Sequence, residues 1–395
     1  MTPKEAELLL PDIRNDESLW NQFSFSPFKD KDGSILDKNS NARYALIIAL
    51  QYNWSTSDEK LLRFIVQNEV KMHQKASGLL YSLHISTYLL AKYKNLENVF
   101  LFFEAKEANF DTYCGLDIEK VFSAGVQKTI EYLKQSTNPV SLRILERVDG
   151  SIVDDYLDEE RLRDWFEEVA RAYPDTVEKE RRITLIDRAI TFKEFQTGRI
   201  LVREWFNDHL NQDYEKGNEF IQKSNLANIV GRAKVLGDFS LAIDAQKIAL
   251  KLCDSPFDRI SKTQTLAELY RLSGSLLKAW TELKNCQPDL EIYKGWNTSG
   301  LGRFVITTAL QLSLDCDKND KIKSEAFYWA HMLISQSRFI TLVIFELAFE
   351  AASAINNSEL MTQYEILRDN EQKRLEDMLA SLHPRNNLGE DSQSQ

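Results

Sequence analysis

The chain has 395 residues and a formal net charge of −11, and 43% of its residues are hydrophobic and 28% charged. This length predicts two or three domains or one elongated array. Because phosphate neutralisation needs clustered Lys and Arg, the acidic balance argues against nucleic acid as the main partner. The chain has 14 glycines and 8 prolines, and this scarcity of turn residues argues against an all-β fold and favours long helices.

Residues 1–140 are predicted to form an N-terminal helical domain with an irregular start. Thr2, Pro3 and Glu5 have the spacing of a capping box with proline at the first helical position. Helical periodicity is then lost between residues 15 and 40 and returns from Ala42 onward. We find no strand ladder in the sequence.

The opening residues contain no basic region followed by an apolar core, so we expect no signal peptide and a cytoplasmic protein. The most apolar run, residues 339–355, is short and contains Glu346 and Glu350. These features predict a buried helix rather than a membrane span, so we expect no association with membranes.

Residues 107–117 (EANFDTYCGLD) interrupt the helical pattern with polar and reactive side chains, namely Asp111, Tyr113, Cys114 and Asp117. Irregular segments between rigid elements often carry binding sites, so these four residues are a possible secondary site. The alternative is a connecting loop with one buried cysteine. All four cysteines are far apart and form no CxxC pair, so we expect buried free thiols in a reducing compartment.

Two similar segments lie between residues 225 and 288. The first reads NLANIVGRAKVLGDFSLAIDAQKIALKL and the second KTQTLAELYRLSGSLLKAWTELKNCQPD. When Gly237 is aligned with Gly274, Ala242 falls on Ala279. Each copy predicts a helical hairpin, in which the glycine ends the first helix and the alanine allows a close helix crossing.

These residues resemble the tetratricopeptide repeat. The second copy matches at Leu266, Ala267, Tyr270, Gly274, Ala279, Leu283 and Pro288, and the first at Ile229, Gly237, Asp238, Ala242, Ala249 and Leu250. The copies are three residues further apart than the 34-residue repeat of the family, and Val230 replaces the usual small residue. The resemblance implies an all-α fold of stacked helical hairpins that form a right-handed superhelix.

The resemblance also implies a domain organisation and a binding surface. Residues 141–216 would be connecting helices, residues 217–382 the repeat domain and residues 383–395 a disordered tail. In the family, the first helix of each hairpin lines a groove that holds a peptide or a partner helix. By position, the groove would be lined by Lys234 in the first copy and by Gln264, Glu268 and Arg271 in the second. Lys234 and Arg271 could pair with a partner carboxylate; the alternative is that both are ordinary exposed charges.

Other chemistry finds little support in the sequence. The glycine-rich stretch at residues 295–302 lacks the lysine of a phosphate-binding loop. The acidic stretch that starts at Asp315 has Asp320 and Ala326 where a calcium loop needs Gly and Glu. The five histidines form no HxxxH or HxxE pair, so we expect no metal and no cofactor.

The leading hypothesis is a non-catalytic scaffold or adaptor that binds a protein or peptide partner in the groove. A first alternative is an immunity or regulatory protein that covers a basic partner, because complementary charge speeds encounter. A second alternative is an enzyme with a site around Asp111, Cys114 and Asp117. High reactivity of the Cys114 thiol would favour the enzyme, and a copurifying protein would favour either binding hypothesis.

Overall fold

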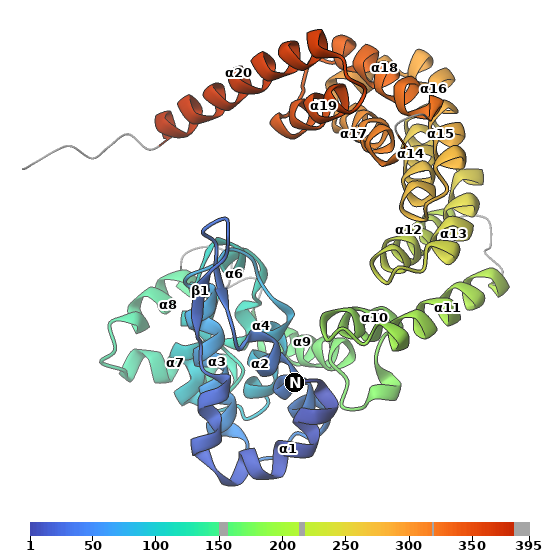
Figure 1. The fold of residues 1–395 in the computed structure, drawn as a ribbon. Coiled ribbons are helices and arrows are strands. Elements are labelled where there is room, and N and C mark those ends of the chain that lie inside the picture. Colours follow the sequence, from blue (N-terminus) through green and yellow to red (C-terminus); the bar gives the residue numbers. More distant parts are fainter. Residues whose placement is uncertain (150–156, 213–217, 318–319, 383–395) are drawn as a thin grey trace, which may run out of the picture. The chain divides into compact units, whose positions relative to one another are not determined.

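The computed structural model describes residues 1–149, 157–212, 218–317 and 320–382. Within these residues the chain forms twenty α-helices and a single hairpin of two short strands, which confirms the predicted all-α fold. The chain divides into two compact units, Met1–Glu194 (unit 1) and Phe195–Gln395 (unit 2) (Figure 1). The division falls inside the segment 141–216, which the sequence predicts as connecting helices. The tail predicted to be disordered lies outside the described residues.

Unit 1 is built from short helices around one core. Its α-helices are α1 (Pro3–Asn15), α2 (Ser40–Tyr52), α3 (Glu59–His73), α4 (Tyr81–Ala91), α5 (Val99–Lys106), α6 (Phe110–Gly115), α7 (Val126–Gln135), α8 (Val140–Asp149), α9 (Glu159–Ala172) and α10 (Arg182–Thr191). Its 3₁₀ helices are η1 (Glu17–Phe23), η2 (Leu96–Asn98), η3 (Ile118–Lys120) and η4 (Val177–Lys179), and its strands are β1 (Pro27–Lys29) and β2 (Ile35–Asp37).

The irregular start of unit 1 is more ordered than the sequence suggests. The capping box at Thr2 is present, with the Thr2 hydroxyl accepting from the Glu5 amide and the Glu5 carboxylate accepting from the Thr2 amide. After α1 come η1 and an antiparallel hairpin in which Phe28 of β1 lies opposite Leu36 of β2. The sequence shows no strand ladder here because strands of three residues are too short to give an alternating pattern.

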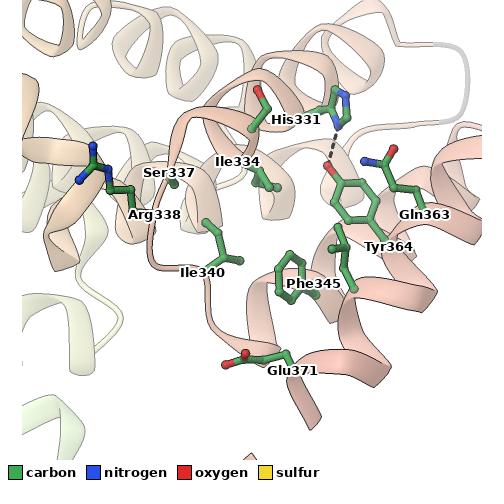
Figure 2. A pocket seen from close by; sticks show the side chains of 11 residues that line it. His331, Ile334, Ser337, Arg338, Ile340, Phe345, Gln363, Tyr364 and Glu371 are labelled. Carbon is green, nitrogen blue, oxygen red and sulfur yellow. Dashed lines mark hydrogen bonds between the residues drawn. The ribbon is translucent and has the colours of Figure 1, made fainter. Parts of the chain in front are cut away.

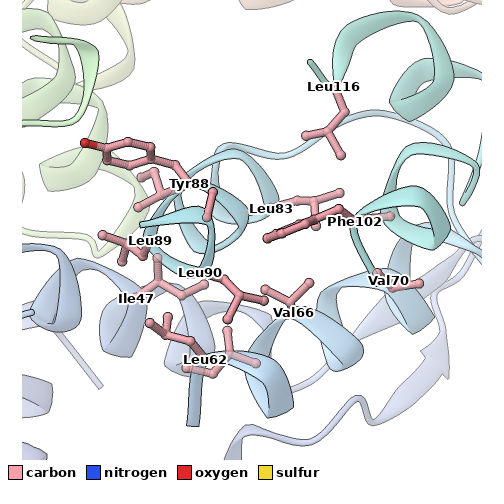
Figure 3. Close-up of a cluster of buried hydrophobic side chains, with 14 of the residues drawn as sticks. Ile47, Leu62, Val66, Val70, Leu83, Tyr88, Leu89, Leu90, Phe102 and Leu116 are labelled. Atoms are coloured by element: carbon pink, nitrogen blue, oxygen red, sulfur yellow. The ribbon is translucent and has the colours of Figure 1, made fainter. Parts of the chain in front are cut away.

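The core of unit 1 is formed by apolar side chains from α2, α3, α4 and α5. Figure 3 shows Ile47, Leu62, Val66, Leu90 and Phe102 converging on one another, and each is at most 1% exposed. Full burial of such a side chain contributes roughly 1.5–3 kcal/mol.

A buried arginine joins the β-hairpin to this helical core. The side chain of Arg43 on α2 is fully buried and donates to Asp37 on β2 at 2.7 Å and to Glu69 on α3 at 2.5 Å. A third bond runs to the carbonyl of Phe23 at 3.1 Å. Burial alone lowers the pKa of Arg43, but the two carboxylates outweigh it and raise this pKa, so the guanidinium stays charged.

Unit 2 consists of longer helices that follow one another in chain order, yellow-green to red in Figure 1. They are α11 (Phe195–Asn211), α12 (Glu219–Val235), α13 (Phe239–Lys251), α14 (Pro256–Leu272), α15 (Leu276–Lys284), α16 (Gln287–Ile292), α17 (Gly300–Asp315), α18 (Lys321–Gln336), α19 (Leu342–Ala354) and α20 (Ser358–Leu382). One 3₁₀ helix, η5 (Lys294–Thr298), precedes α17. The helix predicted at residues 339–355 is α19, which is buried along one side only, at Ile344, Ala348, Ala351 and Ala352.

Eight helices of unit 2 pack as four helical hairpins. The first hairpin is α12 with α13, the second α14 with α15, the third α17 with α18 and the fourth α19 with α20, and each contacts the next. The predicted turns are present, since Gly237 and Gly274 adopt φ of +70° and +78°. Ala242 and Ala279 are completely buried, as a close helix crossing requires. The two hairpins predicted from the sequence therefore form where the glycines and alanines indicate.

The second and third hairpins are also joined through a pair of tryptophans. The rings of Trp280 on α15 and Trp329 on α18 meet edge to face, with centroids 5.9 Å apart. The indole of Trp280 donates to Glu325 at 3.0 Å, and that of Trp329 donates to Gln287 at 3.0 Å. Each indole N–H therefore has an acceptor on a neighbouring helix, as the buried Trp280 and the half-buried Trp329 require.

Candidate functional site

The first helices of three successive hairpins in unit 2 are connected by a line of charged side chains. Lys234 on α12 lies 3.7 Å from Glu268 on α14. Arg271, also on α14, contacts Glu268 at 2.8 Å and Asp315 on α17 at 2.5 Å. We call Lys234, Glu268, Arg271 and Asp315 the charge ladder. It links α12 to α14 and α14 to α17.

A neutral contact runs parallel to the charge ladder. The side-chain amide of Gln264 on α14 donates to the hydroxyl of Thr308 on α17 at 2.8 Å. The structure therefore brings together all four residues assigned to the groove, namely Lys234, Gln264, Glu268 and Arg271. It does so on one face, formed by the first helices of the hairpins, which we call the first-helix face.

Arg271 differs from the sequence interpretation in one respect. Its guanidinium holds Glu268 through two nitrogens and Asp315 through a third, and its side chain is only 11% exposed. Burial lowers the pKa of Arg271, but the two carboxylates outweigh this and raise the pKa overall. Arg271 is therefore paired within the chain, and its contact with a partner carboxylate stays a prediction. Lys234, whose side chain is 43% exposed, is the accessible cation of the ladder.

An exposed aromatic side chain lies on the same face and was missed in the sequence. Phe304 on α17 is 62% exposed. It precedes Thr308 by four residues and Asp315 by eleven, a spacing that places all three on one face of a helix. The spacing could have revealed Phe304, had the third hairpin been recognised as a repeat of the first two.

The third and fourth hairpins enclose a pocket of about 340 Å³. Figure 2 shows its lining from α18, α19 and α20, where His331 and Tyr364 point toward one another and form a hydrogen bond of 2.7 Å. Burial raises the pKa of Tyr364, so its hydroxyl stays protonated. Arg338 and Glu371 add opposite charges to the lining. This volume lies near the lower end of small-ligand pockets and also suits a partner side chain.

The segment 107–117 is structured rather than irregular. Its centre is the short helix α6, which Asn109 begins with a reciprocal capping box to Thr112. Asp111 accepts a hydrogen bond from the Gly78 amide at 2.6 Å and so fixes the loop between α3 and α4. The segment still separates α5 from η3, since residues 107–109 and 116–117 are not helical. The capping side chains compensate for the shortness of α6.

The other members of the possible secondary site hold separate positions. Tyr113 is 46% exposed and lies beside the ammonium of Lys106, with 5.7 Å from the nitrogen to the ring centroid. Cys114 is exposed, contrary to the expected burial. Asp117 forms an ion pair of 2.7 Å with Lys120, whose side chain is only 1% exposed. Asp111 and Asp117 thus each have a structural partner outside the proposed set.

Burial and the ion pair of Lys120 with Asp117 set the protonation of His84. Burial and the Lys120 ammonium lower the pKa of His84, Asp117 partly opposes them, and the resulting pKa is about 4. His84 is therefore neutral near pH 7. Burial raises the pKa of Asp117, but Lys120 outweighs burial and lowers this pKa overall. The sequence did not indicate this association because α4 and η3 are far apart in the chain.

Metal binding and reactive thiols find limited support in the structure. Among the described residues, no three His, Cys, Asp or Glu side chains are grouped so that they could hold a metal ion. All four cysteines are free, as predicted. Cys286 and Cys316 are buried, and burial raises their pKa values to about 12 and about 11. Neither buried thiol is activated for nucleophilic attack.

The glycine-rich stretch at 295–302 has a packing role. A Cβ atom on Gly302 would lie 2.6 Å from the carbonyl oxygen of Trp296, so only glycine fits where α17 passes this tryptophan. In the predicted acidic loop, Asp315 belongs to the charge ladder and Asp320 caps α18. Residues 318 and 319 lie outside the described residues.

Comparisons with known proteins identify no relative of this chain. No family model matches the chain, and neither the curated proteins nor the solved structures contain a significant match. Within the described residues, none of the helices has both the length and the apolar character to cross a bilayer.

Proposed function

We propose that this protein is a non-catalytic interaction scaffold, whose unit 2 is a tetratricopeptide-like array that binds a peptide or a partner protein on the first-helix face. Support for the array comes from the four successive hairpins, of which the first two carry the Gly and Ala positions of the repeat. A helical hairpin cannot bury its apolar face alone, so it stacks on a copy of itself. Such stacks offer the exposed side of their first helices to partners.

The observation that carries the proposal is the combination of the charge ladder with Phe304 on one face. The ladder connects neighbouring hairpins and leaves Lys234 and Asp315 43% and 44% exposed. Phe304 adds an apolar surface that the described residues leave 62% exposed. Phe304 and Asp315 are separated by eleven residues of α17, about 16 Å, so an extended partner could contact both. Exposed aromatic side chains are typical of the residues that dominate binding energy in protein interfaces.

The test compares two phenylalanines of nearly equal exposure. Phe304 on the first-helix face is 62% exposed, and Phe339, in the loop before α19, is 63% exposed. Partners captured from the source cell by the wild-type protein are identified, and their affinities for Phe304→Glu and Phe339→Glu are measured by titration calorimetry. We expect Phe304→Glu to weaken binding at least tenfold and Phe339→Glu to leave it unchanged. Equal binding by both variants would refute the first-helix face as the binding surface.

A second candidate function rests on the net charge of −11. An acidic protein associates rapidly with a basic one, so the scaffold could act as an immunity or regulatory protein that covers a basic partner. The two candidates differ in the salt dependence of the association rate. A rate that falls steeply between 50 and 300 mM salt, together with loss of the partner's own activity in the complex, would favour the regulatory role. A salt-independent rate would favour the adaptor.

A further inference from the structure

An open pocket of about 660 Å³ lies in unit 1, between the end of α4, the start of α7 and one face of α9. Its lining includes three lysines, Lys92, Lys94 and Lys128, although the protein as a whole is acidic. This volume lies within the range of pockets that hold small ligands.

None of the three lysines has an ion-pair partner among the described residues. Lys92 lies over the ring of Trp54 at 4.3 Å and Lys94 over the ring of Phe166 at 5.3 Å. Burial lowers the pKa of Lys92, and Asp175 only partly opposes this effect. Aromatic faces thus take the place of carboxylates beside two of the ammonium groups, which leaves an excess of positive charge at the pocket.

The carboxylate that lines the pocket is engaged elsewhere. Glu159 accepts hydrogen bonds from the backbone amides of Val126 at 2.8 Å and Gln127 at 3.4 Å, at the N-terminus of α7. It therefore neutralises the helix end rather than the lysines. The pocket also contains Arg163, but its guanidinium already contacts Glu160 and Asp164.

We propose that this pocket binds a small ligand that carries phosphate groups on a planar ring system, such as a nucleotide. Three ammonium groups exceed the charge of a monocarboxylate, whereas one phosphate ester carries about −1.5 to −2 and a diphosphate carries more. Lysine binds phosphate as a point charge and does not need the paired geometry that arginine gives to carboxylates. Tyr88 and Phe166 also line the pocket, and the carbon atoms that they expose there give the planar part of the ligand an apolar contact.

A neighbouring pocket extends the site. It has a volume of about 450 Å³ and shares Tyr88 and Lys92 with the first pocket. It contains two further cations: Lys179, which is paired with Asp175 at 2.9 Å, and Arg171, whose Nε donates to the carbonyl of Glu167 at 3.2 Å. Lys92, Lys94 and Lys128 all line the larger pocket, where the phosphate groups would lie. The smaller pocket offers space for the rest of a longer ligand.

The structure provides a matched pair of variants for the test. Lys94 and Lys193 each follow the end of a helix with positive φ, +50° and +60°, a conformation that favours glycine. Only Lys94 lines the pocket. Lys94→Gly and Lys193→Gly therefore relieve the same backbone strain, and both should raise the melting temperature, but only Lys94→Gly removes a pocket cation. Lys128→Gln removes a second pocket cation without altering the backbone.

Binding of inorganic pyrophosphate, metal-free ATP, adenosine and a hexaglutamate peptide is measured by titration calorimetry with the full-length protein. We expect pyrophosphate to bind, ATP to bind more tightly and adenosine alone to bind weakly. We expect Lys94→Gly and Lys128→Gln each to weaken ATP binding at least tenfold, and Lys193→Gly to bind as wild type. Absence of pyrophosphate and ATP binding at millimolar concentration, or wild-type affinity in both pocket variants, would overturn the proposal. Tighter binding of hexaglutamate than of pyrophosphate would also overturn it and would indicate an acidic protein partner.

Discussion

Arg271 on α14 donates a hydrogen bond of 2.5 Å to Asp315 on α17 and so ties the second hairpin of unit 2 to the third. The same guanidinium holds Glu268, whose side chain is 16% exposed. Arg271→Leu leaves this largely buried carboxylate with the ammonium of Lys234, 3.7 Å away, as its remaining cation. We expect the free energy of unfolding to fall by about 1–3 kcal/mol. Urea denaturation followed by circular dichroism measures this change.

The control for this prediction is Lys234→Ala, at the exposed end of the charge ladder. Because exposed ion pairs contribute about 0–1 kcal/mol, this variant should unfold close to the wild-type urea midpoint. An equal loss of stability in Lys234→Ala and Arg271→Leu would contradict the central position of Arg271 in the ladder.

Two glycines in the first and second hairpins should respond to alanine in opposite directions. Gly231 lies within α12, and a Cβ atom there meets nothing within 4 Å. Gly231→Ala should therefore stabilise the protein by about 0.5–1 kcal/mol. Gly274 has φ of +78°, so Gly274→Ala should destabilise it by about 1–2 kcal/mol. Melting temperatures that shift in the same direction in both variants would contradict the turn assigned to Gly274.

The buried ammonium of Lys120 and its partner Asp117 give a pH-dependent prediction at His84. The unfolded histidine titrates near 6.5, whereas burial and Lys120 lower its folded pKa to about 4. Between these values the unfolded state binds a proton that the folded state does not, so stability falls as the pH falls through this range. The difference between the unfolded and folded pKa values corresponds to a loss in the free energy of unfolding of at most about 3 kcal/mol.

This prediction is checked by thermal unfolding at pH 7 and pH 4.5. His84→Gln cannot take up the proton, so its melting temperature should decrease less than that of the wild type over this interval. Carboxylates contribute equally in both proteins, and the comparison removes their effect. Parallel decreases in the two proteins would show that His84 is not held neutral in the folded state.

Variants of Arg43 test how much the buried ion network contributes to the stability of unit 1. Arg43→Met leaves Asp37 and Glu69 buried without their cation, and we expect a loss of about 3–5 kcal/mol. Arg43→Met combined with Asp37→Asn and Glu69→Gln removes the unpaired charges and should recover part of this loss. Guanidinium denaturation of both variants measures the difference. A combined variant less stable than Arg43→Met alone would contradict this account.

Thiol labelling should show whether the Cys114 thiol is only exposed to solvent or is also activated as a nucleophile. Cys114 is exposed, whereas Cys286 and Cys316 are buried with raised pKa values. We expect Cys114 to react first with a maleimide, at the rate of an ordinary exposed thiol. A rate well above that of free cysteine at the same pH would indicate an activated nucleophile and would revive the enzyme hypothesis.

The sequence predicted the features of unit 2 that depend on local chemistry. Gly237 and Gly274 mark turns because few other residues adopt positive φ, and Ala242 and Ala279 mark close helix crossings. The third hairpin was not recognised as a repeat because α16 and η5 separate it from the second. The sequence also could not show that Arg271 finds Asp315, because the two residues are 44 positions apart and only hairpin stacking joins them.

Unit 1 was less predictable from its sequence for a related physical reason. Its candidate ligand pocket collects Lys94, Lys128 and Phe166 from three separate segments, none of which carries a motif. The association of His84 with Lys120 likewise depends on the packing of α4 against η3. Local patterns determine where helices begin and end, whereas these sites arise only from contacts between helices.

The edge-to-face pair of Trp280 and Trp329 provides an intrinsic optical reporter. Two indoles with centroids 5.9 Å apart and planes at 78° couple their electronic transitions, and each ring belongs to a different hairpin. The near-ultraviolet circular dichroism of the protein should therefore contain a signal that depends on their separation. Loss of this signal before loss of the helical signal would mean that the second and third hairpins part before either one unwinds.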